Sequence, residues 1–152
     1  NDKRIKSAAA FDGWFFPLDQ KTFSTKTNKP FLHLGQEEYL NIDIGGDINN
    51  SESGKINFDI HNIILENNTS SFVVYVENSL HVDFTDYKQT YIQGRPFTIP
   101  ISDFGDISKN KIKNIMNRSI LEFFNYSLKD KKFDTTILDK YKEDIEVSYD
   151  IN

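Results

Sequence analysis

Cysteine is missing from this 152-residue sequence, which excludes thiol catalysis, disulfide bonds and metal sites built from thiolates. Long apolar stretches are missing too. No run approaches the ~20 residues that a membrane-spanning helix needs, so no transmembrane segment is expected. Residues 1–10 lack the apolar stretch of a signal peptide, although the chain begins at Asn1 rather than Met, as a processed product would. These observations do not assign a compartment; they favour an extracytoplasmic over a cytoplasmic location.

Arginine and glycine are also scarce. Arginine occurs only at Arg4, Arg95 and Arg118, and the net charge is −5 with an isoelectric point near 5.2. Nucleic-acid binding requires concentrated positive charge, so we do not expect nucleic acid as the partner. The seven glycines are scattered, and Gly45-Gly46 precedes a polar loop instead of a helix. This argues against the familiar nucleotide-binding loops.

Length and composition describe one ordinary domain. With 38% hydrophobic and 27% charged residues, a single folded domain over residues 11–152 is expected. The only alanines are the consecutive Ala8, Ala9 and Ala10, so we interpret residues 1–10 as a possible tag or processed leader remnant and give them no weight in deriving the fold. The excess of Lys over Arg, with abundant Asn and Ile, is typical of an AT-rich genome.

Alternating apolar and polar residues predict several half-buried strands. The pattern occurs in residues 40–44, 56–60, 80–84, 97–101 and 145–149. Residues 31–34 form a shorter extended piece, and residues 72–76, apolar throughout, predict the central strand. The turn-forming residues 77–79 would join this strand to the next as a hairpin.

The period changes near Asp106, where apolar residues at helical spacing predict an amphipathic helix over residues 107–129. A shorter helix is expected at 136–142. The fold class that follows is α+β: an antiparallel β-sheet or partial sandwich of about five to seven strands, with the C-terminal amphipathic helix packed on it. One core should contain residues from both layers, namely Ile56, Phe58, Ile60, Phe72, Val74, Val76, Ile120 and Phe124.

Aromatic residues are the feature that most suggests a binding surface. Trp14, Phe15 and Phe16 lie in a short segment broken by glycine and proline, and Tyr87 and Tyr91 add two phenol rings. Tryptophan and tyrosine are favoured anchors at protein interfaces, and exposed flat rings can also bind sugars. The competing interpretation is that these rings fill a core short of Ala and Leu.

The metal-binding motifs fail in part or in full. The loop that starts at Asp47 resembles a calcium loop, but Glu52 and Phe58 occupy the positions of the required Gly and bidentate Glu. Asp43, Asp47 and Asn49 therefore remain only weak metal candidates. We expect no metal and no cofactor.

The catalytic motifs also lack required members. Ser108 and Lys111 match S-x-x-K without its companion elements, so Ser108 is interpreted as a helix cap. His33, His61 and His81 all lie in expected strands and are predicted to face the surface, where replacement has little consequence. A Ser–His–Asp grouping could be drawn from these residues, but no G-x-S-x-G motif supports it.

Function is therefore assigned by elimination. We expect a non-catalytic binding or assembly module that makes protein–protein contacts, such as an envelope accessory domain, a secretion or phage component, or an acidic inhibitor. A small carbohydrate-binding module is the alternative, with a glycan as partner. A hydrolase with an unrecognised site is the third hypothesis, so an enzyme is not favoured but is not excluded.

Overall fold

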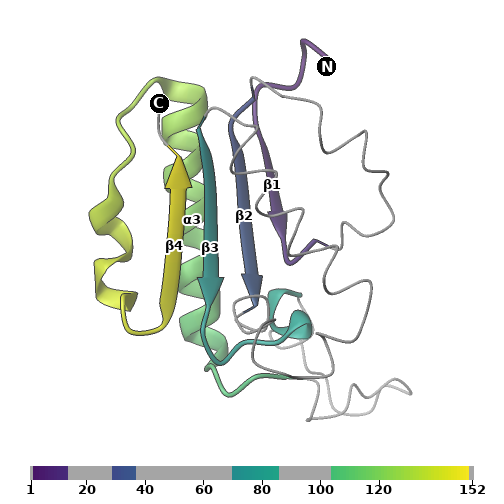
Figure 1. Cartoon of the computed structure of the whole chain (residues 1–152), viewed down its shortest axis with the longest axis vertical. Coiled ribbons are helices and arrows are strands. Elements are labelled where there is room, and N and C mark those ends of the chain that lie inside the picture. Colours follow the sequence, from purple (N-terminus) through teal and green to yellow (C-terminus); the bar gives the residue numbers. More distant parts are fainter. Residues whose placement is uncertain (1, 14–28, 37–69, 86–103, 151–152) are drawn as a thin grey trace.

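A computed structural model describes residues 2–13, 29–36, 70–85 and 104–150 of the chain. Four strands form one sheet in the order β1 (Ala8–Phe11), β2 (Phe31–Gln36), β3 (Ser71–Val76) and β4 (Ile145–Asp150). The first three strands are parallel, and β4 pairs antiparallel with β3 (Figure 1).

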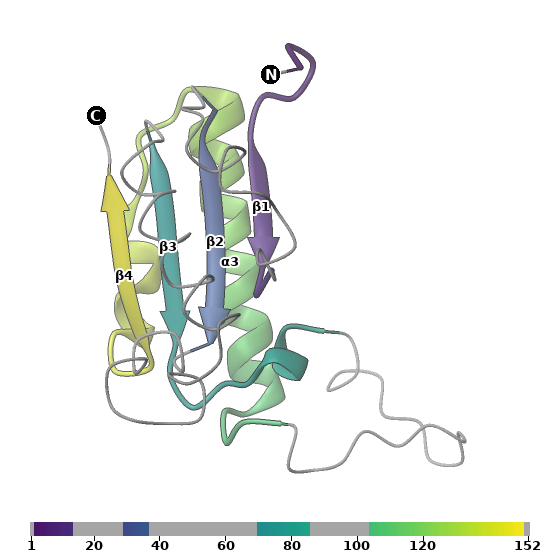
Figure 2. The same cartoon turned by 45° about the vertical axis from the view of Figure 1, so that its right-hand side comes forward.

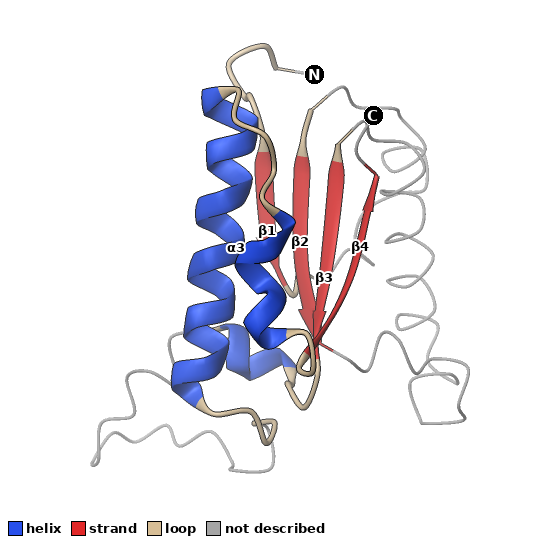
Figure 3. Ribbon diagram, turned by 90° about the vertical axis from the view of Figure 1, so that its left-hand side faces the viewer, coloured by secondary structure: helices blue, strands red, loops and turns tan. Residues whose placement is uncertain are grey.

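A helical layer covers one face of the sheet. The long helix α3 (Lys109–Lys129) runs behind the strands in Figure 2, and Figure 3 shows helices and sheet as two layers. The 3₁₀ segment η7 (Thr135–Tyr141) packs beside α3, and the short 3₁₀ turn η4 (His81–Phe84) follows β3. Ser108 is the N-cap of α3, and its side chain accepts a hydrogen bond from the Lys111 amide, as expected from the sequence.

The core lies between the sheet and α3. Alternate residues of the two inner strands face the helix, and Ile112, Ile115 and Phe123 of α3 meet them with no exposed surface. The strand residues in this cluster are Leu32, Leu34, Phe72, Val74 and Val76. Val73 and Tyr75, on the other face of β3, are also buried, as expected for the central apolar run.

The expected antiparallel sheet of about five to seven strands is wrong, because β1, β2 and β3 are parallel. Parallel strands need connections of a dozen or more residues, and segments 12–30 and 37–70 provide that length. The hairpin expected after residue 76 is also wrong, since residues 81–84 form the turn η4. The expected strand at 72–76, the helix at 107–129 and the final strand correspond to β3, α3 and β4.

Other expectations are confirmed in part, or they concern residues that the structure does not describe. Ile120 and Phe124 are partly buried against the core that contains Phe72, Val74 and Val76. The expected strands at 40–44, 56–60 and 97–101, with core residues Ile56, Phe58 and Ile60, lie outside the described residues.

The first residues of the chain take part in the sheet. Ala8, Ala9 and Ala10 pair in register with residues of β2, although residues 1–10 were set aside when the fold was derived from the sequence. Among the described residues, no helix is both long and apolar enough to cross a membrane.

Candidate active site

Three residues far apart in the sequence meet at one edge of the sheet. Asp12 directly follows β1, Gln36 ends β2, and His81 begins the turn after β3. The carboxyl ends of parallel strands all lie at the same edge, which is where open α/β sheets bind ligands. In Figure 1, η4 lies at the end to which β2 and β3 point.

Asp12 is fully buried, and both of its carboxylate oxygens accept hydrogen bonds. The backbone amide of Gln36 donates to Oδ1 at 3.1 Å, and Oδ2 lies 2.5 Å from Nδ1 of His81. The backbone of Asp12 has a φ of 45°, a left-handed conformation that aspartate tolerates better than most residues. This turn directs the carboxylate across the strand ends.

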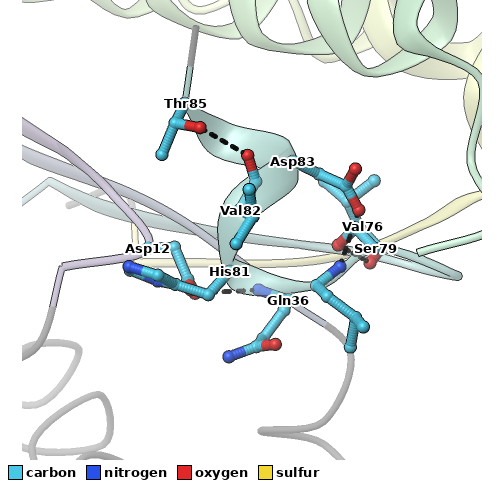
Figure 4. Close-up of polar contacts among 9 residues, drawn as sticks. Asp12, Gln36, Val76, Ser79, His81, Val82, Asp83 and Thr85 are labelled. Carbon is cyan, nitrogen blue, oxygen red and sulfur yellow. Dashed lines mark hydrogen bonds and ion pairs between the residues drawn. The ribbon is translucent and has the colours of Figure 1, made fainter. Parts of the chain in front are cut away.

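His81 faces Asp12 across 69 positions of sequence, as Figure 4 shows. Its side chain is 40% exposed, whereas that of Asp12 is completely covered. A buried carboxylate is costly unless it is paired and hydrogen-bonded, and the imidazole together with the Gln36 amide meets this requirement. The pair therefore consists of a fixed, covered acid and a base that solvent can reach.

Side-chain hydrogen bonds replace the expected strand at residues 80–84 with a turn. Asn78 adopts a left-handed φ of 55°, and the hydroxyl of Ser79 donates to the carbonyl of Val76 at 2.6 Å. The carboxylate of Asp83 accepts from the Leu80 amide at 2.8 Å, and the Thr85 hydroxyl donates to Val82 at 2.6 Å. Such local bonds compete with strand pairing and leave His81 at the sheet edge instead of within a strand.

An aspartate–histidine contact of this kind occurs in a known class of enzymes. A buried aspartate that holds Nδ1 of a histidine fixes the imidazole tautomer and supports the charge that forms when the base takes a proton, as in Ser–His–Asp hydrolases. Asp precedes His along this chain, which is the order in α/β-hydrolases. The fold and the pair together define a hydrolase-like α/β protein.

Comparison with known proteins agrees with that class. The family model for platelet-activating factor acetylhydrolase, isoform II, matches residues 1–146, and the chain belongs to this family. A ferulic acid esterase from Streptomyces cinnamoneus has a similar fold, with a TM-score of 0.62 and 18% sequence identity. That similarity covers 97% of this chain but only 40% of the esterase. No curated protein matches the sequence.

These findings overturn the expected function. The non-catalytic binding or assembly module, with its sugar-binding alternative, is wrong, because the chain belongs to an acetylhydrolase family and shares its fold with an esterase. The hypothesis placed third from the sequence, a hydrolase with an unrecognised site, fits the findings instead.

The aromatic and metal candidates from the sequence do not lie in the described part of the site. The aromatic candidates Trp14, Phe15, Phe16, Tyr87 and Tyr91 and the weak metal candidates Asp43, Asp47 and Asn49 all lie outside the described residues. Within the described ranges, no group of three His, Cys, Asp or Glu side chains could hold a metal ion.

The histidines differ from their expected positions. His33 is fully buried in β2, and His81 lies in η4 opposite Asp12, so the surface-strand prediction is wrong for both. His61 lies outside the described residues. Asp12 was not singled out at all. The available signal was a carboxylate directly after an apolar segment, upstream of a histidine that follows the strongest strand, in Asp-then-His order.

Proposed function

We propose that this chain provides the acid–base part of an ester hydrolase, with His81 as the general base and Asp12 as the residue that orients it. The observation that carries the proposal is the contact between the buried Asp12 carboxylate and Nδ1 of the partly exposed His81. Membership in an acetylhydrolase family and the fold of a ferulic acid esterase support carboxylic esters as the substrate class.

The reaction has two steps. His81 Nε2 accepts the proton of a hydroxyl nucleophile as the nucleophile's oxygen attacks the ester carbonyl carbon. The carbon–oxygen bond to the leaving alcohol then breaks, and His81 returns the proton to that alcohol. In the second step, the oxygen of a water molecule attacks the acyl carbon while His81 takes a proton from that water. The bond between the acyl carbon and the nucleophile's oxygen then breaks, the carboxylic acid leaves, and the nucleophile recovers the proton from His81. Asp12 stabilises the imidazolium in both steps and stays ionised.

We propose that the hydroxyl nucleophile comes from outside the described residues. In α/β-hydrolases the serine precedes the aspartate in the chain. The only serine before Asp12 is Ser7, which lies at the opposite end of β1 from Asp12. Its Oγ lies 3.0 Å from Oγ of Ser127. Ser7 and Asp12 are five residue steps apart, which is roughly 16 Å in extended chain. The similarity covers only 40% of the esterase, which supports a nucleophile supplied by further polypeptide.

The test measures hydrolysis of p-nitrophenyl acetate by the polypeptide as its gene encodes it. His81→Ala and Asp12→Asn should each lower kcat by about 10³- to 10⁴-fold, as expected for loss of an acid–base group or of its orienting carboxylate. Asp139→Asn, at an exposed aspartate of η7, is the control and should keep full activity. Unchanged hydrolysis in the His81→Ala variant would show that this pair is not the acid–base machinery.

A further inference from the structure

Asp83 connects the turn that holds His81 to the segment that starts α3. Its Oδ2 accepts two backbone hydrogen bonds, one from Leu80 at 2.8 Å and one from Gly105 at 2.8 Å. The two donors are separated by the whole of segment 86–103, and the carboxylate is fully buried. This oxygen of Asp83 therefore links the backbone at Leu80 to the backbone at Gly105.

The backbone at this junction is unusually close. A Cβ on Gly105 would overlap the carbonyl oxygen of Asn78, so only glycine fits there without displacement. The Ile107 amide donates to the same Asn78 carbonyl at 2.9 Å. Segment 104–108 thus rests directly on residues 78–83, and Asp83 fixes their separation.

This junction links the start of α3 to the turn that carries His81. The helix begins at Lys109, immediately after the segment that Asp83 binds, and its residues Ile112 and Ile115 are fully buried in the core. On the other side, Leu80 directly precedes His81. Asp12, by contrast, is held by β1 and by the amide of Gln36. The two members of the pair are therefore carried by different parts of the fold.

We infer that Asp83 is a positioning residue for His81: by accepting the amides of Leu80 and Gly105, it sets the distance and angle at which the imidazole meets Asp12. Its catalytic consequence rests on the proposed function, but the structural coupling does not. A misplacement of about 1 Å can cost a catalytic group about a hundredfold in rate, so the effect should be measurable.

The experiment compares Asp83→Ala and Asp83→Asn in the full chain, with Asp139→Ala, at an exposed aspartate of η7, as the control. The spectroscopic readout is the proton NMR signal of His81 Nδ1–H, assigned by its loss in Asp12→Asn. We expect Asp83→Ala to broaden or remove this signal and to lower kcat about 10- to 100-fold, with KM changed less than about twofold. Asp83→Asn keeps an acceptor oxygen and should restore both, and Asp139→Ala should leave both unchanged.

An independent measurement on the unaltered protein covers the case in which Asp83→Ala does not fold. Amide hydrogen exchange at Leu80 and Gly105 should be at least about tenfold slower than in exposed loop peptides, because both amides donate to a buried oxygen. The inference is overturned if neither amide is protected, if folded Asp83→Ala keeps the His81 signal and kcat, or if folded Asp83→Asn behaves like Asp83→Ala.

The outcomes separate this inference from the proposed function. If His81→Ala leaves hydrolysis unchanged, the proposed function fails, while the NMR and exchange results still decide whether Asp83 positions His81. If His81→Ala abolishes hydrolysis but Asp83→Ala has no effect on the signal or on kcat, only the present inference fails.

Discussion

Buried carboxylates in the described part of the chain each bind backbone from a different segment. Asp12 accepts the Gln36 amide, Asp83 accepts those of Leu80 and Gly105, and Glu122 of α3 accepts the Asp134 amide at 2.9 Å. A buried carboxylate is tolerated when its charge is met by such donors. Asp12 differs because its second oxygen contacts an imidazole. Among these three buried carboxylates, and within the described ranges, only Asp12 contacts the side chain of a second titratable residue, whereas Asp83 and Glu122 accept backbone amides.

Neighbouring phenylalanines on α3 allow a matched test of the core. Phe123 has no exposed surface and packs edge-to-face on Phe72 with ring centroids 6.0 Å apart, whereas Phe124 is only partly buried. Phe123→Ala should lower the free energy of unfolding by about 3–5 kcal/mol, since it leaves a cavity in a packed cluster. Phe124→Ala should cost at least about 1 kcal/mol less. Urea unfolding of both variants measures the difference, and equal losses would contradict this description of the core.

At the scale of elements, the sequence pattern predicted helices better than strand pairing. The apolar spacing predicted α3 because a helix is defined by its own periodicity. The same reasoning failed at residues 80–84, where apolar alternation indicated a strand. There, hydrogen bonds between the side chains of Ser79, Asp83 and Thr85 and nearby backbone stabilise a turn. The alternation of apolar and polar residues contains no information about these bonds. The error concealed the element that holds His81.

The start of α3 provides a test of a motif that resembled a catalytic one. Ser108 accepts the Lys111 amide at 3.3 Å, while the Lys111 ammonium lies 2.8 Å from Asp144 instead of the hydroxyl. Ser108→Ala should therefore lower the free energy of unfolding by about 1 kcal/mol, and Ser108→Asp should retain the cap. Neither change should alter ester hydrolysis by more than about twofold, as both residues lie outside the proposed acid–base pair. Loss of activity in the aspartate variant with normal stability would revive the catalytic interpretation.

The start of η7 gives a prediction about pH. The hydroxyl of Thr136 donates to the Asp134 carboxylate at 2.6 Å, and this bond, helped by the Thr136 amide, lowers the pKa of Asp134. Because the folded pKa lies below the unfolded one, the cap is fully stabilising above the unfolded pKa and is lost as pH falls through the folded value. Thr136→Val should raise the pKa of Asp134 toward its ordinary value, measured by carboxyl NMR titration. An unchanged titration would mean that the hydroxyl bond is not the main cause.

At the scale of the whole molecule, strand direction separates what the sequence predicted from what it did not. The strand at 72–76 is recognisable because it is buried on both faces. Its place in a parallel sheet depends instead on the long connections 12–30 and 37–70, whose effect on strand direction the sequence pattern does not reveal. The candidate site depends on the same topology. Asp12 and His81 meet only because parallel strands bring their carboxyl ends to one edge, so spacing along the chain carries no signal for this pair.

The position of the nucleophile is the prediction that tests the whole arrangement. Among the described serines, Ser79 is closest to His81 in sequence, but it is 1% exposed and its hydroxyl donates to the Val76 carbonyl. Ser7 lies at the opposite end of β1 from Asp12.

A fluorophosphonate reacts with an activated serine, forming an oxygen–phosphorus bond and releasing fluoride, and the general base accepts the serine proton. The gene-encoded polypeptide should therefore be labelled at one serine outside the described residues, as identified by mass spectrometry of its peptides. His81→Ala should slow labelling at least about a hundredfold, because the serine then lacks its base, and the Asp139→Asn control should label normally. Labelling at Ser79 or Ser7, or equally fast labelling without His81, would contradict a nucleophile that approaches the sheet edge from outside the described part of the chain.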